Sequence, residues 1–384
     1  MPFDPAKLAA DVEAFCTALR PVEELCYAEH TFNAELPKLA KQHNLLGINV
    51  DPRYGGRGAD TPSYLKALAR IGREGTGPRT FFSGHLSIGA YPIQTWGSEV
   101  LKQKYLPSAV RGETILAFGL TEPDAGSNPR EMTSTFEATP AGYRLNGTKY
   151  LISNGGIAQA IIVFAYPKGE PAGRISAFVV DTSSPGFAVE SFTANAKMGM
   201  PTSNTAMFEM TDVMVPKENL LGEEGAGFRI AMGTLVSGRL SVAAGCLGVI
   251  EDCLAESIAY AKMRSQHGKE IGKHQLVQDH IAQIEMNRIA SDCLIARAAE
   301  AKDRGTPQEA DLLAAKAKFF ATNAAWDSAD RAVQVFGGRG WSTLYRPGRH
   351  LMDVRVCRIY EGTDEILKLK IAASLLGKEY EAFR

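Results

Sequence analysis

The spacing of apolar residues changes twice along this chain of 384 residues, and these two changes restrict its fold more than any other feature. From Pro5 to about Ala117, segments such as LAADVEAFCTALR carry apolar residues three and four positions apart, which is typical of amphipathic helices. From Phe118 to about Leu221 the spacing falls to two, which indicates strands. After GEEGAG the helical spacing returns. We therefore predict an α+β chain with an N-terminal helical domain (1–117), a middle β domain (118–224) and a C-terminal bundle (225–384).

Local signals refine this prediction. Gly47 is placed to end the helical segment LPKLAKQHNLLG, and Asn146-Gly147 is a typical hairpin turn because both residues tolerate a positive φ. Strands are predicted in YRLNGTKYLIS, AIIVFAYP, ISAFVVD, FAVESF and TAMFEMTDVMVP. Two long segments, QLVQDHIAQIEMNRIASDCLIARAAEAKDRG and DLLAAKAKFFATNAAWDSADRAVQVFGG, are typical of an antiparallel helical bundle.

Composition excludes several classes of function. The formal net charge is −1 and no basic run is interleaved with aromatic residues, so nucleic acid is not an expected partner. No apolar segment approaches the roughly twenty residues of a membrane span, and the N-terminal residues lack a signal pattern, so we expect a cytoplasmic protein. The six cysteines form no CxxC pair, which indicates reduced packing residues.

The usual nucleotide and metal motifs are missing. GEEGAGF and FGGRGW complete neither GxGxxG nor a P-loop, and there is no HExxH, so we expect neither a Rossmann site nor a metal centre. The loop LTEPDAGSN is more informative, since it stands where the first strand should begin. It is either an ordinary turn or a ligand loop, in which Gly126 permits close approach of a ligand while Thr121 and Ser127 offer donors.

Seven motifs together resemble those of the acyl-CoA dehydrogenase family, in order and in spacing. They are LTEPDAGSN, LNGTKYLISNG, KMGMPTSNTAMFEMTDVMVP, GRLSVAAGCLG, YAKMRSQHGKEIGKHQLVQ, VFGGRGW and RIYEGTDEI. The resemblance implies a helical domain, a middle β-barrel or sandwich domain and a C-terminal four-helix bundle. It also implies bound FAD, an acyl-CoA substrate, an electron-transfer flavoprotein as electron acceptor and a homotetramer.

The same resemblance assigns residues to the cofactor. Phe118, Leu120 and Thr121 are implied beside the flavin ring, with Gly126 and Ser127 in the adjoining loop. Leu151 replaces the usual Trp and Ser153 the usual Thr, so the ring is less shielded but the hydroxyl is kept. The remaining cofactor assignments are Arg264, His267 (in place of Phe) and Gln275, then Gln334, Gly337 and Gly338 from a neighbouring subunit, and Thr363 and Glu365. Arg264 could instead simply stabilise a helix C-terminus.

Glu361 in RIYEGT matches the catalytic base of the family. A thioester α-proton is weakly acidic, so the reaction needs a base beside it and donors where enolate charge develops. The resemblance implies that Glu361 takes the α-proton, that its backbone N–H and a flavin hydroxyl bind the thioester oxygen, and that flavin N5 accepts the β-hydride to give the trans-2-enoyl-CoA. Burial by Tyr360 and the substrate should raise the pKa of Glu361.

Some family members place the base immediately before the arginine of SGRLS, where this chain has Gly238. Arg239 is expected near the site, and the substrate-side assignments are Arg239, Ser127, Tyr360 and Gly362. Met352 replaces an arginine that usually precedes Asp353, which leaves the local ion pair uncertain in this chain.

The acyl group remains open between two classes. Arg79 matches the arginine with which glutaryl-CoA dehydrogenases bind a distal carboxylate, with Thr80 and Ser83 as neighbouring hydroxyls. Phe81 and Phe82 favour a short or branched apolar tail instead. For the reaction itself, a dehydrogenase is the main hypothesis, and the alternatives are a flavin oxidase or monooxygenase on the same fold, or a non-catalytic relative that acts as a scaffold.

Overall fold

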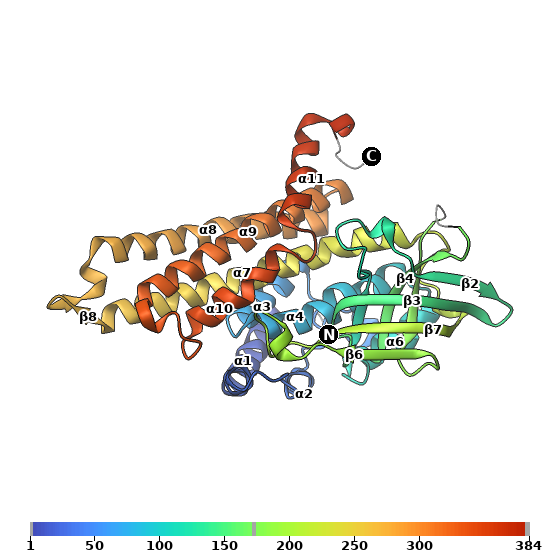
Figure 1. Ribbon diagram of the computed structural model, residues 1–384, viewed down its shortest axis with the longest axis horizontal. Coiled ribbons are helices and arrows are strands. Elements are labelled where there is room, and N and C mark those ends of the chain that lie inside the picture. The colour runs from blue at the N-terminus through green and yellow to red at the C-terminus, as the bar shows by residue number, and fades with distance from the viewer. Residues whose placement is uncertain (1–2, 171–173, 381–384) are drawn as a thin grey trace.

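The computed structural model describes residues 3–170 and 174–380 and has three parts in sequence order (Figure 1). The first part is helical. Its elements are α1 (Pro5–Ala28), α2 (Leu36–Gln42), α3 (Thr61–Gly72), α4 (Thr76–Phe82), the π-helix η2 (Ser83–Ala90), α5 (Tyr91–Trp96) and α6 (Glu99–Val110). Asp4, Asp60 and Ser98 cap α1, α3 and α6 by accepting hydrogen bonds from first-turn N–H groups.

The middle part is a β-sheet with seven strands among the described residues. They are β1 (Leu116–Gly119), β2 (Thr135–Thr139), β3 (Gly142–Ser153), β4 (Ala160–Pro167), β5 (Ser176–Asp181), β6 (Phe187–Ser191) and β7 (Thr205–Pro216). The strand order is β1-β4-β2-β3-β7-β6, with β5 also paired to β4. β4 runs parallel to β1 and β2, and the other pairs are antiparallel. The inward side chains form a core of their own, which includes Phe136, Phe178 and Phe208.

The third part is built on three long helices, α7 (Gly227–Met263), α8 (Gln275–Arg304) and α9 (Pro307–Phe336). The short strands β8 (Ser265–Gln266) and β9 (Lys269–Glu270) join α7 to α8 at the end of the bundle far from the sheet (Figure 1). α10 (Arg346–Val354) packs along α9 and α7, and α11 (Asp364–Leu376) projects beyond the bundle (Figure 1). The predicted fold class is confirmed. Residues 117 and 224, at which we propose the domain boundaries, lie in β1 and shortly before α7.

Three local predictions were wrong. Asn146 and Gly147 lie inside β3, at a bulge opposite β7, and the hairpin between β2 and β3 turns at residues 140–141 instead. Asn146 exchanges hydrogen bonds with Asp212 at this bulge. A side chain expected in a turn therefore stabilises an irregular part of a strand. Helix α2 ends at Gln42, not near Gly47, because Asn44 adopts the left-handed conformation (φ 55°). The loop LTEPDAGSN follows a strand, β1, that we did not predict.

The prediction that no apolar segment approaches the length of a membrane span was wrong, because α7 contains a stretch that is long and apolar enough by length and composition. This stretch is 83% buried within the protein. Its apolar character is explained by its position, since α7 packs against α3, α8 and α9 and exposes little surface.

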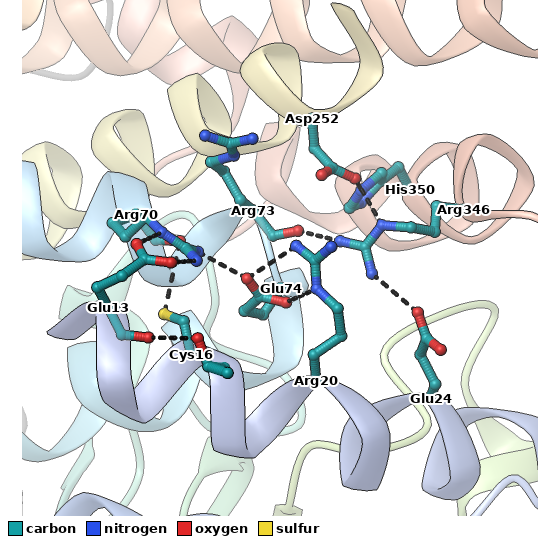
Figure 2. Close-up of polar contacts among 11 residues, drawn as sticks. Glu13, Cys16, Arg20, Glu24, Arg70, Arg73, Glu74, Asp252, Arg346 and His350 are labelled. Carbon is teal, nitrogen blue, oxygen red and sulfur yellow. Dashed lines mark hydrogen bonds and ion pairs between the residues drawn. The ribbon is translucent and has the colours of Figure 1, made fainter. Parts of the chain in front are cut away.

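A buried charged cluster joins the N-terminal helices to the bundle (Figure 2). The Glu74 carboxylate, whose side chain has no exposed surface, accepts hydrogen bonds from Arg20 (2.7 Å) and Arg70 (2.6 Å). Beside it, Arg346 on α10 pairs with Asp252 on α7 at 2.7 Å and also donates to the backbone at the end of α3. The cluster therefore fixes α1 and α3 against α7 and α10. Of these helices, α7 lines the pocket described below.

Candidate functional site

All three parts of the chain line one open pocket of about 640 Å³. The helical part contributes α4 and η2, the sheet contributes the ends of β1 and β3, and the bundle contributes α7 and the segment before α11. The lining residues are Arg79, Thr80, Ser83, Gly84, Ile88, Phe118, Leu120, Thr121, Leu151, Ile152, Ser153, Leu235, Val242, Tyr360 and Glu361. Residues predicted for the ring, the base and the acyl tail, far apart in sequence, therefore meet in one cavity.

Glu361 stands in this pocket with a strained backbone and an unpaired carboxylate. Its φ is +57°, in the left-handed region that non-glycine residues seldom adopt. Its Oε2 is buried and has no hydrogen-bond partner among the described residues. Strain and an unsatisfied buried acceptor on one residue are both typical of functional sites.

The helix opposite Glu361 leaves room for the carboxylate. A Cβ placed on Gly238 of α7 would lie 2.4 and 2.5 Å from the two carboxylate oxygens of Glu361. The glycine at the alternative base position therefore not only lacks a carboxylate but also makes the space in which Glu361 sits. This contact was not predicted from the sequence.

Two buried cations hold the backbone carbonyls of Glu361 and of the residue that follows it. Arg239 donates from Nε to the Glu361 carbonyl at 3.1 Å and pairs through Nη1 with Asp311 at 2.8 Å. Lys318 on α9 donates from Nζ to the Gly362 carbonyl at 2.7 Å. Arg239 and Gly362, expected on the substrate side, are not among the residues that line the pocket. Thr363, expected on the cofactor side, caps α11 by accepting from Ile366 N–H at 3.2 Å.

The electrostatic environment suits a base that must exchange protons near neutral pH. Burial raises the pKa of Glu361 to about 7, although the positive charges of Arg239, Arg79 and Lys318 lower it. The backbone N–H of Glu361 donates to no acceptor within the described part of the chain. The residue thus offers both a proton acceptor and a free donor.

The sheet side of the pocket fits a flat aromatic cofactor. Leu151 has a φ of +57° and a side chain that is 55% exposed in the pocket, close to Ser153 at the end of β3. Phe118 lines the same side from β1. An apolar side chain held in the open beside a hydroxyl and a phenyl ring suits the face and polar edge of a flavin. These residues fit FAD.

The loop that carries Thr121, Gly126 and Ser127 is fixed by a buried ion pair. Glu122 accepts from Lys149 at 2.7 Å and from the N–H groups of residues 133 and 134. Burial raises the pKa of Glu122, but the charge and hydrogen bond of Lys149 lower it to about 2. We did not predict this pair, although Lys149 occupies an inward position of β3, a signal that could have identified it. Gly126 and Ser127 are exposed, and a Cβ on Gly126 would meet no atom within 4 Å.

A second group of predicted cofactor residues lies at the opposite end of the bundle (Figure 1). Its members are exposed and do not line the pocket: Arg264, His267, Gln275, Gln334, Gly337 and Gly338. The ring of Tyr260 stacks on Phe336 with centroids 4.1 Å apart and joins the two halves of this group. Arg264 is also the C-cap residue of α7. Glu365 is exposed in the first turn of α11.

Comparison with protein families gives three matches that together span almost the whole chain. The N-terminal, middle and C-terminal domains of acyl-CoA dehydrogenase match residues 5–113, 117–213 and 225–376. The chain belongs to the acyl-CoA dehydrogenase family. The predicted resemblance is thereby confirmed.

Individual family members are similar over nearly their full length. An acyl-CoA dehydrogenase of Bacillus subtilis is 38% identical over 360 residues, which cover 94% of each chain. The butyryl-CoA dehydrogenase of Megasphaera elsdenii has a TM-score of 0.92 and 35% identity, covering 98% of this chain and 100% of that one. A glutaryl-CoA dehydrogenase of Mycobacterium smegmatis in complex with FADH2 has a TM-score of 0.91 and 30% identity, covering 100% and 97%.

Proposed function

We propose that this chain, an FAD-dependent acyl-CoA dehydrogenase by family, uses Glu361 to remove the α-proton of an acyl-CoA thioester. The observation that carries the proposal is the Glu361 carboxylate itself, which stands unpaired in the common pocket with a pKa of about 7. A carboxylate with this pKa is half ionised near neutral pH, which is close to the best compromise for a general base.

Arg239, Lys318 and Glu361 would have different roles in this reaction. Arg239 and Lys318 hold the segment of Glu361 through its backbone carbonyls, so the carboxylate is in place before substrate arrives. The unpaired N–H of Glu361 would donate to the thioester oxygen as enolate charge develops there. A bound flavin supplies the acceptor for the β-hydride. Glu361 then keeps the α-proton while the trans-2-enoyl-CoA leaves.

The test is Glu361→Gln, which keeps the shape of the side chain and removes its basicity. We expect the variant to retain FAD and to bind butyryl-CoA, while bleaching of the flavin by substrate slows on the order of a hundredfold or more. Bleaching as fast as in the parent would exclude Glu361 as the base. Loss of FAD from the variant would show instead that the substitution disturbs the fold of the site.

For the acyl group, we propose a short apolar or branched tail as the main substrate class. Ile88, Leu235 and Val242 present apolar surface to the pocket. Arg79 also lines it and keeps a second candidate, a tail that ends in a carboxylate. Rates with butyryl-CoA, isobutyryl-CoA and glutaryl-CoA separate the two classes: a preference for the first two supports the apolar tail, and a preference for glutaryl-CoA that Arg79→Ala abolishes supports the acidic tail.

A second candidate reaction is that of a flavin oxidase or monooxygenase, in which the reduced cofactor reacts with oxygen. The exposed side chain of Leu151 favours it, because Leu shields a ring less than the Trp usual at this position. Stopped-flow reoxidation in air-saturated buffer distinguishes the reactions. For the dehydrogenase we propose an electron-transfer flavoprotein as acceptor and a cytoplasmic location, so oxidation by air should be slow and oxidation by the flavoprotein fast.

We further propose that FAD is shared between copies of this chain in a homotetramer. Arg264 and Gln334 belong to the group of residues at the far end of the bundle from the pocket, and they would contact a cofactor held in another copy. Large apolar side chains are exposed near the same group, among them Leu276 (81%) and Trp341 (87%), and burial against a second copy would cover them.

Sedimentation of the purified holoprotein tests the assembly directly, and a monomer that holds FAD tightly would overturn it. The shared site is tested with Arg264→Ala, which should purify with less FAD because charge-assisted hydrogen bonds to the pyrophosphate are lost. The matched control is Arg297→Ala, which removes an exposed arginine from α8. A full complement of tightly held FAD in Arg264→Ala would contradict the assignment.

A further inference from the structure

Arg79 is a fully buried cation at the wall of the acyl pocket. Only 2% of its surface is exposed, and its side chain crosses α7 over Gly245, where a Cβ would lie 2.6 Å from Cγ and Nε. A guanidinium stays protonated in proteins. A buried charge is strongly unfavourable unless a counter-charge and hydrogen bonds compensate it. The fold therefore needs an anion near Arg79.

No carboxylate lies within ion-pair distance of Arg79 in the described part of the chain, and its Nε has no hydrogen-bond partner there. Its Nη2 instead donates to the Tyr360 hydroxyl and points to the Cys357 sulfur at 3.9 Å. The Tyr360 hydroxyl and the Cys357 sulfur are themselves 3.0 Å apart. Glu361 lines the same pocket and its pKa is lowered by the charge of Arg79, but it makes no hydrogen bond to that residue. Of the two groups that Arg79 contacts directly, the thiol is the more easily ionised, because a thiol loses its proton more easily than a phenol.

Cys357 has the surroundings of a thiolate. It is buried in η8 (Arg355–Arg358), and five charged or titratable groups face it from the neighbouring elements: Arg79 of α4, Cys246 of α7, Lys318 of α9, Asp353 of α10 and Tyr360. Burial raises the pKa of Cys357, but the neighbouring Cys246 thiol, the positive charges of Arg79 and Lys318 and the hydrogen bond with Tyr360 outweigh it and lower the pKa below its usual range.

The other groups in the cluster keep their protons. Burial and the neighbouring sulfur raise the pKa of Tyr360, and the hydrogen bond with Cys357 together with burial raises that of Cys246. The Tyr360 hydroxyl therefore donates to the Cys357 sulfur, and Cys246 stays a neutral thiol. Cys357 does not line the pocket but lies behind Arg79 and Tyr360, so it does not contact substrate directly.

We propose that Cys357 carries a thiolate that serves as the counter-ion of Arg79 and so allows the acyl pocket to accept an uncharged tail. The inference rests on the proposed function for the identity of the pocket, and it makes Cys357 a positioning residue that determines substrate class. While the thiolate neutralises Arg79, an ion pair with Arg79 would add little to the affinity for a substrate whose tail ends in a carboxylate. Without the thiolate, Arg79 would favour a substrate that brings its own anion.

The first test reads the charge of Cys357 without any substrate. In a Cys293→Ser background, which removes the exposed thiol, we expect the ultraviolet absorption of a thiolate to appear in the holoprotein with a midpoint below that of an ordinary thiol. Cys357→Ser should abolish this absorption, and Cys246→Ala, which leaves Cys357 in place, should retain it. Cys16 and Cys253 do not interfere, since burial raises the pKa of each.

An absorption at neutral pH that is identical in the background protein and in Cys357→Ser would overturn the proposal. This result is independent of turnover, so it would leave the proposed function standing. Conversely, a thiolate signal in a protein that oxidises no acyl-CoA would refute the proposed function and leave the ion pair in place. If Cys357→Ser does not fold, the pH titration of the Cys293→Ser protein alone still decides, because an absence of thiolate below pH 8 contradicts the proposal.

The second test measures specificity. The ratio of kcat/KM for glutaryl-CoA to that for butyryl-CoA should rise about tenfold or more in Cys357→Ala, since an unpaired guanidinium gains a charged hydrogen bond from the tail. Cys246→Ala is the matched control, because it removes a buried sulfur from the same cluster without removing the proposed charge. An equal ratio in Cys357→Ala and the parent would refute the role in specificity.

Discussion

Gly238→Ala separates the proposed catalytic role of Glu361 from the stability of the fold more sharply than any substitution of Glu361 itself. The added Cβ would lie 2.4 Å from a Glu361 carboxylate oxygen, whereas ordinary contacts begin at 3.4 Å, so the carboxylate must retreat by about 1 Å (3.4 − 2.4). Misplacement of a reacting group by about 1 Å can lower a rate on the order of a hundredfold. We therefore expect kcat/KM for butyryl-CoA to fall by roughly that factor.

The expected effect on stability has the opposite sign. Gly238 lies inside α7, and alanine in a helix interior is about 0.5 to 1 kcal/mol more favourable than glycine. The group that must move is the end of a flexible side chain without a hydrogen bond to lose at Oε2. The melting temperature of Gly238→Ala should therefore equal or slightly exceed that of the parent.

The assay is steady-state turnover with butyryl-CoA and an artificial electron acceptor, paired with thermal unfolding of the same preparation. The control is the double variant with Glu361→Gln, in which the alanine should add little further loss because the carboxylate it displaces is already gone. Full activity of Gly238→Ala would refute the described packing. An equal loss in the presence and absence of Glu361 would show that the alanine acts through another group.

Four further outcomes follow from the structure. Because the pKa of Glu361 is raised to about 7 and only its ionised form accepts a proton, kcat/KM should rise about tenfold per pH unit below pH 7 and level off above it; a flat profile from pH 5 to 8 contradicts this. Glu74→Ala should lower the free energy of unfolding by roughly 2 to 4 kcal/mol in a urea titration, because Glu74 has no exposed surface and binds two arginines. Glu13→Ala, which removes an exposed partner of the same Arg70, should cost less than about 1 kcal/mol, and equal costs would refute the distinction. Burial raises the pKa of Asp353 to about 7, so the folded state keeps a proton that the unfolded state releases above about pH 4; stability should fall by on the order of 1 kcal/mol per pH unit between about pH 4 and 7, and Asp353→Asn should flatten that slope.

Apolar spacing predicted the regular elements well, since it depends only on neighbouring residues. The bounds of β4 and β7 agree with the alternating segments AIIVFAYP and TAMFEMTDVMVP. The hairpin turn predicted at Asn146-Gly147 was wrong, because these residues lie opposite β7 and form a bulge within β3. β1 was missed because all four of its residues are buried, so its sequence LAFG does not alternate, and β2 was missed although it is as long as the predicted strand β6.

The candidate site was predicted through its motifs, whereas its supporting contacts were not. Glu361, Leu151 and Ser153 were identified from the segments that contain them, and they line one pocket. The contact of Arg79 with Cys357 joins residues 278 positions apart, and the fit of Gly238 to Glu361 depends on how two elements cross. Such contacts are created by tertiary packing, so no local sequence pattern predicts them. Of the six cysteines interpreted as packing residues, Cys293 is exposed, and for Cys357 we propose a charge.

Isotope exchange tests the removal of the α-proton by Glu361 without reliance on hydride transfer. In an acyl-CoA that carries oxygen in place of the β-carbon, the α-protons remain acidic but no β-hydride can leave. The holoenzyme in heavy water should exchange these α-protons for deuterium, as followed by mass spectrometry, and Glu361→Gln should slow the exchange on the order of a hundredfold while it still binds the analogue. Equal exchange by the two proteins would contradict the assignment of Glu361 as the base.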